Sequence, residues 1–111
     1  MPTVLPIEDL RRGPTAALFE GGEEIGVSFF MTRYPEHGQG PDLHLHPYPE
    51  AFIVEEGTAT FTVGDEDTEV GEGHVVVVPA QTPHAFKNAA VDGVLRVVSI
   101  HPSPQVEQTD L

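Results

Sequence analysis

Residues 38–57 read GQGPDLHLHPYPEAFIVEEG and place two histidines, two prolines and a glutamate within seven consecutive positions. His44 and His46 are two residues apart, and side chains two apart on a strand point to the same face. Pro47 and Pro49 exclude a helix through this stretch, so Glu50 is expected to open the next strand and to face the same interior. The stretch therefore predicts two imidazoles and one carboxylate that converge inside a sheet structure.

A fourth candidate ligand lies in a second stretch, GHVVVVPAQTPHAFKN at residues 73–88. His84 follows Pro83 directly and stands at the start of a strand expected at residues 85–88. The chain has no cysteine, so any metal must be held by nitrogen and oxygen. Three imidazoles and one carboxylate form a donor set for a divalent transition metal, and iron, manganese, nickel, copper and zinc all accept it.

The two stretches resemble the two signature motifs of the cupin superfamily. The first matches at every motif position, with the pattern Gly38-x5-His44-x-His46-x3-Glu50-x6-Gly57. The second departs at one position, with the pattern Gly73-x5-Pro79-x-Gln81-x2-His84-x3-Asn88. The family usually has glycine at the place of Gln81, a turn position that often needs a positive φ, so a side chain there costs about 1 kcal/mol or shifts the loop.

The resemblance implies a small single-domain cupin barrel, an all-β fold of the antiparallel double-stranded β-helix or jelly-roll type. It also implies that His44, His46, Glu50 and His84 are metal ligands near one end of the barrel interior. Family members of this kind are commonly homodimers that often exchange an N-terminal strand, and the Pro-rich start of this chain suits such an exchange.

The remainder of the sequence is compatible with a β-barrel. Eleven glycines and eleven prolines are scattered through 111 residues, and turn signals recur at short intervals. We expect an N-terminal arm or edge strand rather than a helix at 1–15, the barrel at 16–101 and a surface tail at 102–111. Within the barrel, Gly21-Gly22 predicts a tight hairpin turn between strands at 16–20 and 24–34. Strict alternation predicts a strand at Thr58–Val63, and the acidic residues 65–69 predict a solvated turn rather than a calcium loop.

The charge of the chain excludes several partners. Eighteen acidic against five basic residues give a formal net charge of −13, which repels nucleic acids and anionic membrane surfaces. The N-terminus has no basic start followed by an apolar run, and no stretch reaches the length of a membrane span. We therefore expect a cytoplasmic protein that binds a small molecule, with neither nucleic acid nor membrane as a partner.

Alternation along the strands also predicts which side chains line a pocket. Phe52 and Val54 share the face of Glu50, and Phe86 shares that of His84, so these three side chains are either substrate contacts or ordinary barrel core. Arg33 and Arg96 lie within expected strands. Either arginine anchors a substrate carboxylate if it points inward, and the alternative is an exposed strand face paired with nearby acidic side chains.

The other three histidines carry weaker signals. His37 is in a loop, His74 follows a turn glycine, and His101 ends a strand before Pro102. We expect surface or structural positions for all three.

Four protein ligands on an octahedral ion leave two adjacent positions, enough for a bidentate substrate or for substrate and O₂. The first hypothesis is a non-haem metal-dependent dioxygenase of an enediol, diketone or phenolic compound. An isomerase or lyase that uses the same ion as a Lewis acid is the nearest enzymatic alternative. A non-catalytic module that binds or stores a small ligand is an alternative of another class, because no general base stands out beyond the ligands. A purely structural metal ranks last, because structural sites usually close the coordination shell.

Overall fold

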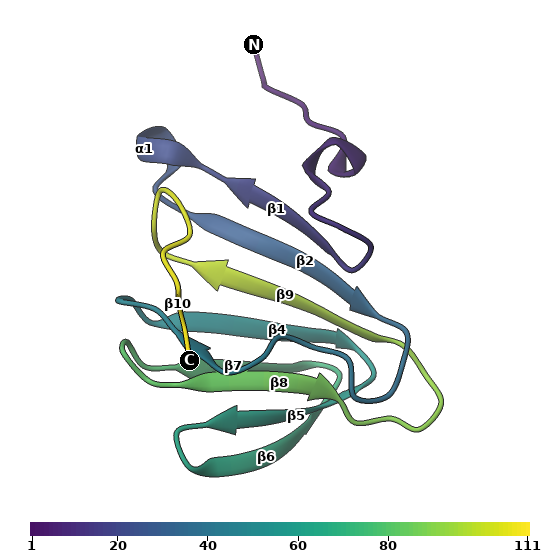
Figure 1. The fold of residues 1–111 in the computed structure, drawn as a ribbon. Coiled ribbons are helices and arrows are strands. Elements are labelled where there is room, and N and C mark those ends of the chain that lie inside the picture. Colours follow the sequence, from purple (N-terminus) through teal and green to yellow (C-terminus); the bar gives the residue numbers. More distant parts are fainter.

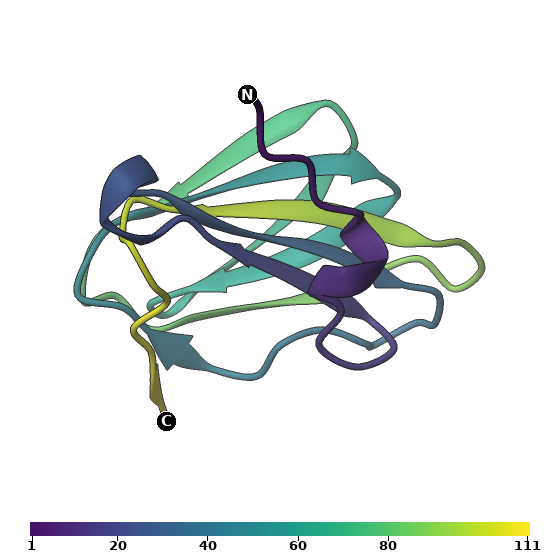
Figure 2. The same cartoon turned by 90° about the horizontal axis from the view of Figure 1, so that it is seen from above.

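The computed structural model describes residues 1–111 and folds them into two five-stranded sheets that face each other (Figures 1 and 2). The first sheet has the order β1-β2-β9-β4-β7 and the second the order β10-β3-β8-β5-β6, with antiparallel pairing throughout. The predicted all-β double-stranded β-helix is confirmed. None of the helices is long and apolar enough to span a membrane. The strands are β1 (Ala16–Glu20), β2 (Ser28–Tyr34), β3 (His44–Leu45), β4 (Glu50–Glu56), β5 (Thr58–Val63), β6 (Glu66–Gly71), β7 (His74–Val78), β8 (His84–Asn88), β9 (Leu95–His101) and β10 (Thr109–Asp110).

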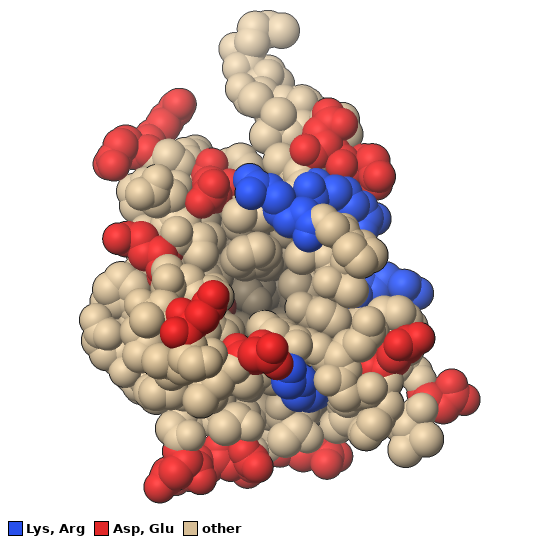
Figure 3. Space-filling model, viewed as in Figure 1, with Lys and Arg blue, Asp and Glu red and all other residues tan.

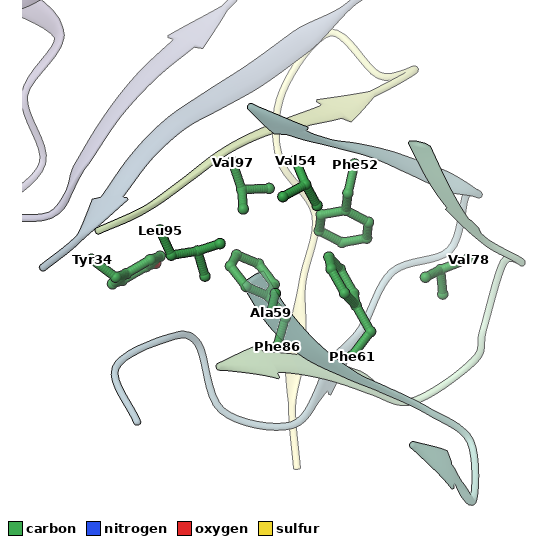
Figure 4. Close-up of a cluster of buried hydrophobic side chains, with 9 residues drawn as sticks. All are labelled: Tyr34, Phe52, Val54, Ala59, Phe61, Val78, Phe86, Leu95 and Val97. Carbon is green, nitrogen blue, oxygen red and sulfur yellow. The ribbon is translucent and has the colours of Figure 1, made fainter. Parts of the chain in front are cut away.

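The core fills the space between the two sheets and follows the alternation of the strands. On β5, Ala59 and Phe61 are buried while the intervening threonines are not, as the sequence predicts. Phe52 on β4 meets Phe61 across the sheets, with ring centroids 5.1 Å apart. Figure 4 shows the nine side chains of this core turned toward one another: Tyr34, Phe52, Val54, Ala59, Phe61, Val78, Phe86, Leu95 and Val97.

The N-terminal segment differs from its prediction as an extended arm. Residues Ile7–Leu10 form a 3-10 helix, which begins directly after Pro6. Proline is compatible with a helix start, because its fixed φ suits the first turn and its missing N–H has no partner there in any case. The segment carries exposed Val4, Leu5 and Ile7, and it projects from the barrel beside β1 (Figures 1 and 2).

The connection from β1 to β2 is longer than predicted. The two strands pair as expected, but one helical turn, α1 (Gly22–Ile25), replaces the tight Gly21-Gly22 hairpin, so β2 begins at Ser28. Gly22 and Gly26 both adopt a positive φ, at 64° and 72°. Glycines therefore stand at the first residue of α1 and directly after its last residue, where the backbone needs a positive φ. The connection uses Gly26 as well as the Gly21-Gly22 pair.

The acidic stretch after β5 is mostly strand. Only Gly64 and Asp65 form the turn, and the chain then enters β6. Thr62 Oγ1 donates a hydrogen bond of 2.7 Å to Asp67 across this hairpin. The side chains at 66–69 are exposed, so the prediction of a solvated hairpin is confirmed, whereas the predicted extent of the turn is wrong.

Gln81 is the one non-glycine residue with a positive φ, at 61°. It adopts the conformation that the family's usual glycine would adopt, at a cost of about 1 kcal/mol. Its backbone N–H donates a hydrogen bond of 2.8 Å to the carbonyl of His46. With glutamine in place of the usual glycine, the loop is therefore still hydrogen-bonded to His46, one of the predicted ligands.

The C-terminal tail returns along the barrel. Ser28 Oγ donates a hydrogen bond of 2.9 Å to the carbonyl of Ser103, which is itself buried. The tail then crosses to the second sheet, where β10 pairs with β3. It is more closely integrated than the predicted surface tail, and β10 pairs Asp110 with His44 of β3.

The motif glycine Gly57 provides a test of the turn between β4 and β5. Its φ is +85°, and a Cβ there would lie 2.3 Å from the carbonyl oxygen of Val94. Gly64 is a matched control, because its φ is +61° and a Cβ added there would meet nothing within 4 Å. We expect Gly57→Ala to lower the free energy of unfolding by about 3 kcal/mol or more and Gly64→Ala by about 1 kcal/mol. Urea unfolding measures both, and equal losses would contradict the steric explanation.

Candidate metal centre

The four predicted ligands meet at one end of the barrel interior. His44 lies on β3, His46 follows it, and Glu50 and His84 are the first residues of β4 and β8. All four are buried, and their nearest ligand atoms lie within 4.8 Å of one another. The convergence predicted from the two separated stretches is thus present in the structure.

The local fold explains this convergence. His44 and His84 are direct cross-strand partners on β3 and β8 in the second sheet. The segment Pro47-Tyr48-Pro49 then carries the chain from β3 to β4, which belongs to the first sheet. Glu50 consequently faces the imidazoles from the opposite wall of the barrel.

Backbone carbonyls orient all three imidazoles in the same way. The Nδ1 atom of His44 lies 2.6 Å from the carbonyl oxygen of Asp42, and that of His84 lies 2.8 Å from the carbonyl oxygen of Thr82. The Nδ1 atom of His46 lies 2.7 Å from the carbonyl oxygen of Glu107 in the C-terminal tail. A carbonyl can only accept, so each Nδ1 carries the proton, and the Nε2 atoms are left as donors of lone pairs.

These Nε2 lone pairs face the carboxylate. Glu50 Oε1 lies 2.9 Å from His84 Nε2 and 3.0 Å from His46 Nε2. The latter nitrogen is buried and has no hydrogen-bond partner, because the short distance is not accompanied by a hydrogen-bonding direction. Neutral imidazoles cannot donate from both nitrogens at once, so the cluster needs an additional positive charge, either a proton or a metal ion. The donor set therefore fits a divalent metal.

The pKa values reflect the same charge imbalance. Burial alone would raise the pKa of Glu50, but the close imidazole nitrogens of His101, His46 and His84 outweigh burial and hold that pKa far below its usual range. Burial lowers the pKa of His44. Burial also acts to lower the pKa of His46, yet the Glu50 carboxylate and the Glu107 carbonyl outweigh it, and that pKa is raised. The carboxylate is therefore favoured in its ionised form, and His46 holds a proton more readily than a free histidine does.

A histidine outside the four predicted ligands also reaches the carboxylate. His101 at the end of β9 is 1% exposed, and its Nε2 atom lies 3.1 Å from Glu50 Oε2. The predicted surface position is therefore wrong for His101, and the structural alternative stands. His37 and His74 are exposed, as expected. The register of β9 on β4 pairs Ala51 with Ile100, which sets His101 beside Glu50.

A cavity of about 200 Å³ adjoins the cluster and includes His44, Glu50 and His101 in its lining. Phe52 and Phe86 line it as well, as the alternation predicts. Val54 does not, because it is fully enclosed in the core. Figure 3 shows a hollow in this face of the molecule, with tan atoms inside it and charged side chains at its rim. The remaining lining residues are Ala16, Phe30, Thr32, Tyr34, Pro41, Ser99 and Gln108.

Neither predicted arginine enters this cavity. Arg33 and Arg96 are cross-strand partners on β2 and β9, and both are exposed on the outer face of the first sheet. Their neighbours in the strands, Tyr34 and Leu95, take the inward positions. Arg96 lies 3.7 Å from Glu55 and 3.9 Å from Glu56, so the paired, exposed alternative is confirmed for Arg96. The prediction that these arginines anchor a substrate in the pocket is wrong.

A family model described as "Cupin domain" matches residues 30–101. The chain belongs to the cupin family. A protein similar to this cupin in sequence is an uncharacterized protein of Streptomyces coelicolor, 40% identical over 60 residues, which are 54% of this chain and 55% of the relative. The chain thus spans about half the length of the curated relative that it matches.

Solved structures share the cupin fold at low sequence identity. A Klebsiella pneumoniae protein with a double-stranded β-helix domain superposes with a TM-score of 0.76 at 14% identity, covering 98% of this cupin and 96% of that chain. A variant of oxalate decarboxylase from Bacillus subtilis gives 0.78 at 18% identity, covering 95% of this cupin but only 31% of that chain. A cupin superfamily protein from Desulfitobacterium hafniense gives 0.65 at 17% identity, covering 90% of both. At these identities the likeness establishes the fold alone.

The geometry of the cluster predicts metal binding by this cupin. We expect Zn²⁺ or Mn²⁺ to raise the melting temperature and a chelator to reverse the effect, because a ligand of the folded state stabilises that state, by about 2.7 kcal/mol at a hundredfold excess over Kd. His84→Gln should abolish the metal-dependent rise, whereas His74→Gln, at an exposed position, should retain it. Thermal unfolding with and without metal measures the effect. Identical curves for the unsubstituted protein in both conditions would contradict a metal site.

The raised pKa of His46 predicts that metal binding depends on pH. A raised pKa means that protonated His46 stabilises the metal-free fold below the usual histidine pKa of 6.5, and that this contribution is lost as pH rises through the raised value. A metal must displace that proton, so the affinity should fall about tenfold per unit as the pH drops below the raised pKa. The stabilisation by metal should therefore grow from pH 5 to pH 8 in a thermal-shift series. A stabilisation independent of pH would rule out competition at His46.

Proposed function

We propose that this cupin is a metal-dependent enzyme of small molecules, and specifically a dioxygenase of a chelating enediol, diketone or phenolic compound. The observation that carries the proposal is the position of the cavity. It opens directly onto His44 and Glu50, so a small molecule within it adjoins the donor set.

The side chains that would hold the metal are His44, His46, Glu50 and His84. When bound, a divalent transition metal would supply Lewis-acid activation and, for a redox-active ion, oxygen chemistry. The chain contributes the orientation of the imidazoles through three backbone carbonyls, and it buries all four side chains. Phe52 and Phe86 pack against each other with ring centroids 5.5 Å apart and form the apolar floor of the cavity.

The cavity favours a particular class of substrate. Its volume of about 200 Å³ is below the range typical of pockets for drug-sized ligands, so the substrate is small. Phe30 and Tyr34 line it together with the two core phenylalanines, while Thr32, Ser99 and Gln108 offer neutral polar groups. No lysine or arginine lines it. A substrate with one acidic, chelating end and an apolar flank matches this lining.

This lining also separates the proposed substrate from oxalate. Oxalate decarboxylase and oxalate oxidase are named among the structural relatives. Oxalate carries two carboxylates and has no apolar part. In this cupin, an oxalate ion would find no cationic side chain in the cavity and would lie against phenylalanine rings. We therefore expect an enediol, diketone or phenol to bind more tightly than oxalate.

Two alternatives lead to different outcomes in the same assays. An isomerase or lyase would use the ion as a Lewis acid and would not need oxygen. A non-catalytic binding module would hold the ligand unchanged.

We also propose that the protein is a homodimer in the cytoplasm. Exposed Val4, Leu5 and Ile7 on the projecting N-terminal segment, with Val75 and Val77 on edge strand β7, give apolar surface for a second copy. A dimer would show twice the chain mass of 12.0 kDa in light scattering. A mass of one chain at micromolar concentration would contradict the dimer.

The decisive experiment compares turnover with and without oxygen. Protein loaded anaerobically with Fe²⁺ or Mn²⁺ is mixed with catechol, acetylacetone, an enediol or oxalate, and oxygen consumption and product are followed. We expect consumption with at least one of the three chelating probes and none with oxalate. His84→Gln serves as the control for metal free in solution, because it should lose the activity while His74→Gln keeps it.

Turnover that is undiminished without oxygen would overturn the dioxygenase and favour the isomerase or lyase. Tight binding of a probe with no conversion of any kind would favour the binding module.

A further inference from the structure

His101 lies outside both sequence motifs and outside the candidate donor set, yet it is buried against Glu50. Its ring centroid is 4.8 Å from that of His46 and 5.6 Å from that of Phe30. Its two nitrogens face two different groups, the Glu50 carboxylate and the hydroxyl of Tyr48. The side chain of His101 therefore either fills space in the core or orients the Glu50 carboxylate.

The partners of the two ring nitrogens, Tyr48 and Glu50, determine which nitrogen of His101 carries its proton. The backbone N–H of Glu107 donates to Tyr48 Oη at 3.2 Å, and Tyr48 Oη lies 2.7 Å from His101 Nδ1. Because the Glu50 carboxylate beside His101 Nε2 can only accept, Nδ1 of a neutral His101 has no proton, and the Tyr48 hydroxyl donates to it. The proton of a neutral His101 is then on Nε2, which donates to Glu50 Oε2.

The tautomer of His101 is thus opposite to that of the other three buried histidines. His44, His46 and His84 have Nδ1 against a carbonyl and present an Nε2 lone pair. His101 instead presents an N–H to the carboxylate. The two oxygens of Glu50 are consequently distinguished: Oε1 faces lone pairs, and Oε2 faces a donor.

We propose that His101, with its proton placed by Tyr48, is a positioning residue that fixes the rotation of the Glu50 carboxylate and thereby presents Oε1 to the metal. This inference rests on the proposed metal site and adds to it the groups that orient its one anionic ligand. A carboxylate without such a partner can rotate and exchange its oxygens, which loosens a site that needs fixed ligand geometry.

The C-terminal tail takes part in the same arrangement. The peptide of Glu107 donates to Tyr48 through its N–H and accepts from His46 through its carbonyl, at 2.7 Å. The tail is held in place by Val106 N–H, which donates to Glu20 at 2.9 Å, and by the bond between Gly22 N–H and the Pro104 carbonyl. One backbone segment thereby orients a metal ligand and the positioning residue.

The test measures metal affinity and ligand geometry in variants of the full chain. His101→Leu fills the space without a hydrogen-bonding group. His101→Gln retains an N–H donor for Glu50 and an acceptor for Tyr48. Tyr48→Phe removes only the hydroxyl that fixes the tautomer. His37→Gln, at an exposed histidine, is the matched control.

Co²⁺ is the probe, because its visible absorption reports on ligand geometry and its titration gives a dissociation constant. We expect His101→Leu to raise the Kd about ten- to a hundredfold and to change the absorption bands. His101→Gln should recover most of the affinity and the spectrum of the unsubstituted protein. Tyr48→Phe should give an intermediate loss, and His37→Gln none. Circular dichroism melting of each metal-free variant shows whether the fold is retained.

The outcomes separate positioning from packing and from the metal site itself. A folded His101→Leu variant with unchanged Kd and spectrum would overturn the positioning proposal and leave the proposed function intact. A loss in His101→Leu that His101→Gln does not restore, accompanied by a lower melting temperature without metal, would assign His101 to packing and would also overturn it. Failure of the unsubstituted protein to bind Co²⁺ would overturn both proposals.

Discussion

The buried carboxylate of Glu50 is the constraint on which the rest of the site depends. An ionised group inside a protein is costly unless charges or hydrogen bonds compensate for it, and Glu50 is 4% exposed. The chain surrounds it with four imidazoles from three strands and a loop. His101 donates a hydrogen bond to it, whereas His46 and His84 turn Nε2 lone pairs toward it. That arrangement is balanced only with an added positive charge, either a proton or a metal ion, so the fit of the site to a metal arises from its packing and not only from a sequence pattern.

The spacing of the first motif is explained by the path of the chain between two sheets. His44 and His46 share a face beside β8, and the Pro47-Tyr48-Pro49 segment then crosses to the opposite wall, where Glu50 begins β4. The motif glycine Gly57 is required because the Val94 carbonyl occupies the space of a side chain. The motif therefore encodes a crossing between sheets together with its ligands, which is why it predicted the fold and the donor set at once.

The sequence was less informative about strands in which no motif residue shows which face points inward. On β9, the choice of which face points inward decides Arg96 and His101 together, because they lie on opposite faces. Placing Arg96 outward, as expected for an arginine in a protein rich in carboxylates, would have placed Leu95, Val97, Ser99 and His101 inward. The signal for His101 was thus present in the pattern. The helical turn at 22–25 and the Glu107 contacts could not be predicted, because they depend on a local turn conformation and on tertiary packing of the tail.

The motifs supply the predicted ligands, whereas the C-terminal tail supplies contacts that orient them. Similarity to other cupins in the motifs therefore does not extend to these orienting contacts. The family match ends at residue 101, whereas the peptide that holds both His46 and Tyr48 belongs to residue 107. A barrel with the same four ligands but a different tail would keep the donors and lose this control over imidazole and carboxylate orientation. Metal affinity and reactivity depend on such outer contacts as well as on the ligands. Structural relatives at 14–19% identity therefore share the barrel with this protein, while the chemistry of its site is determined by contacts that each chain supplies for itself.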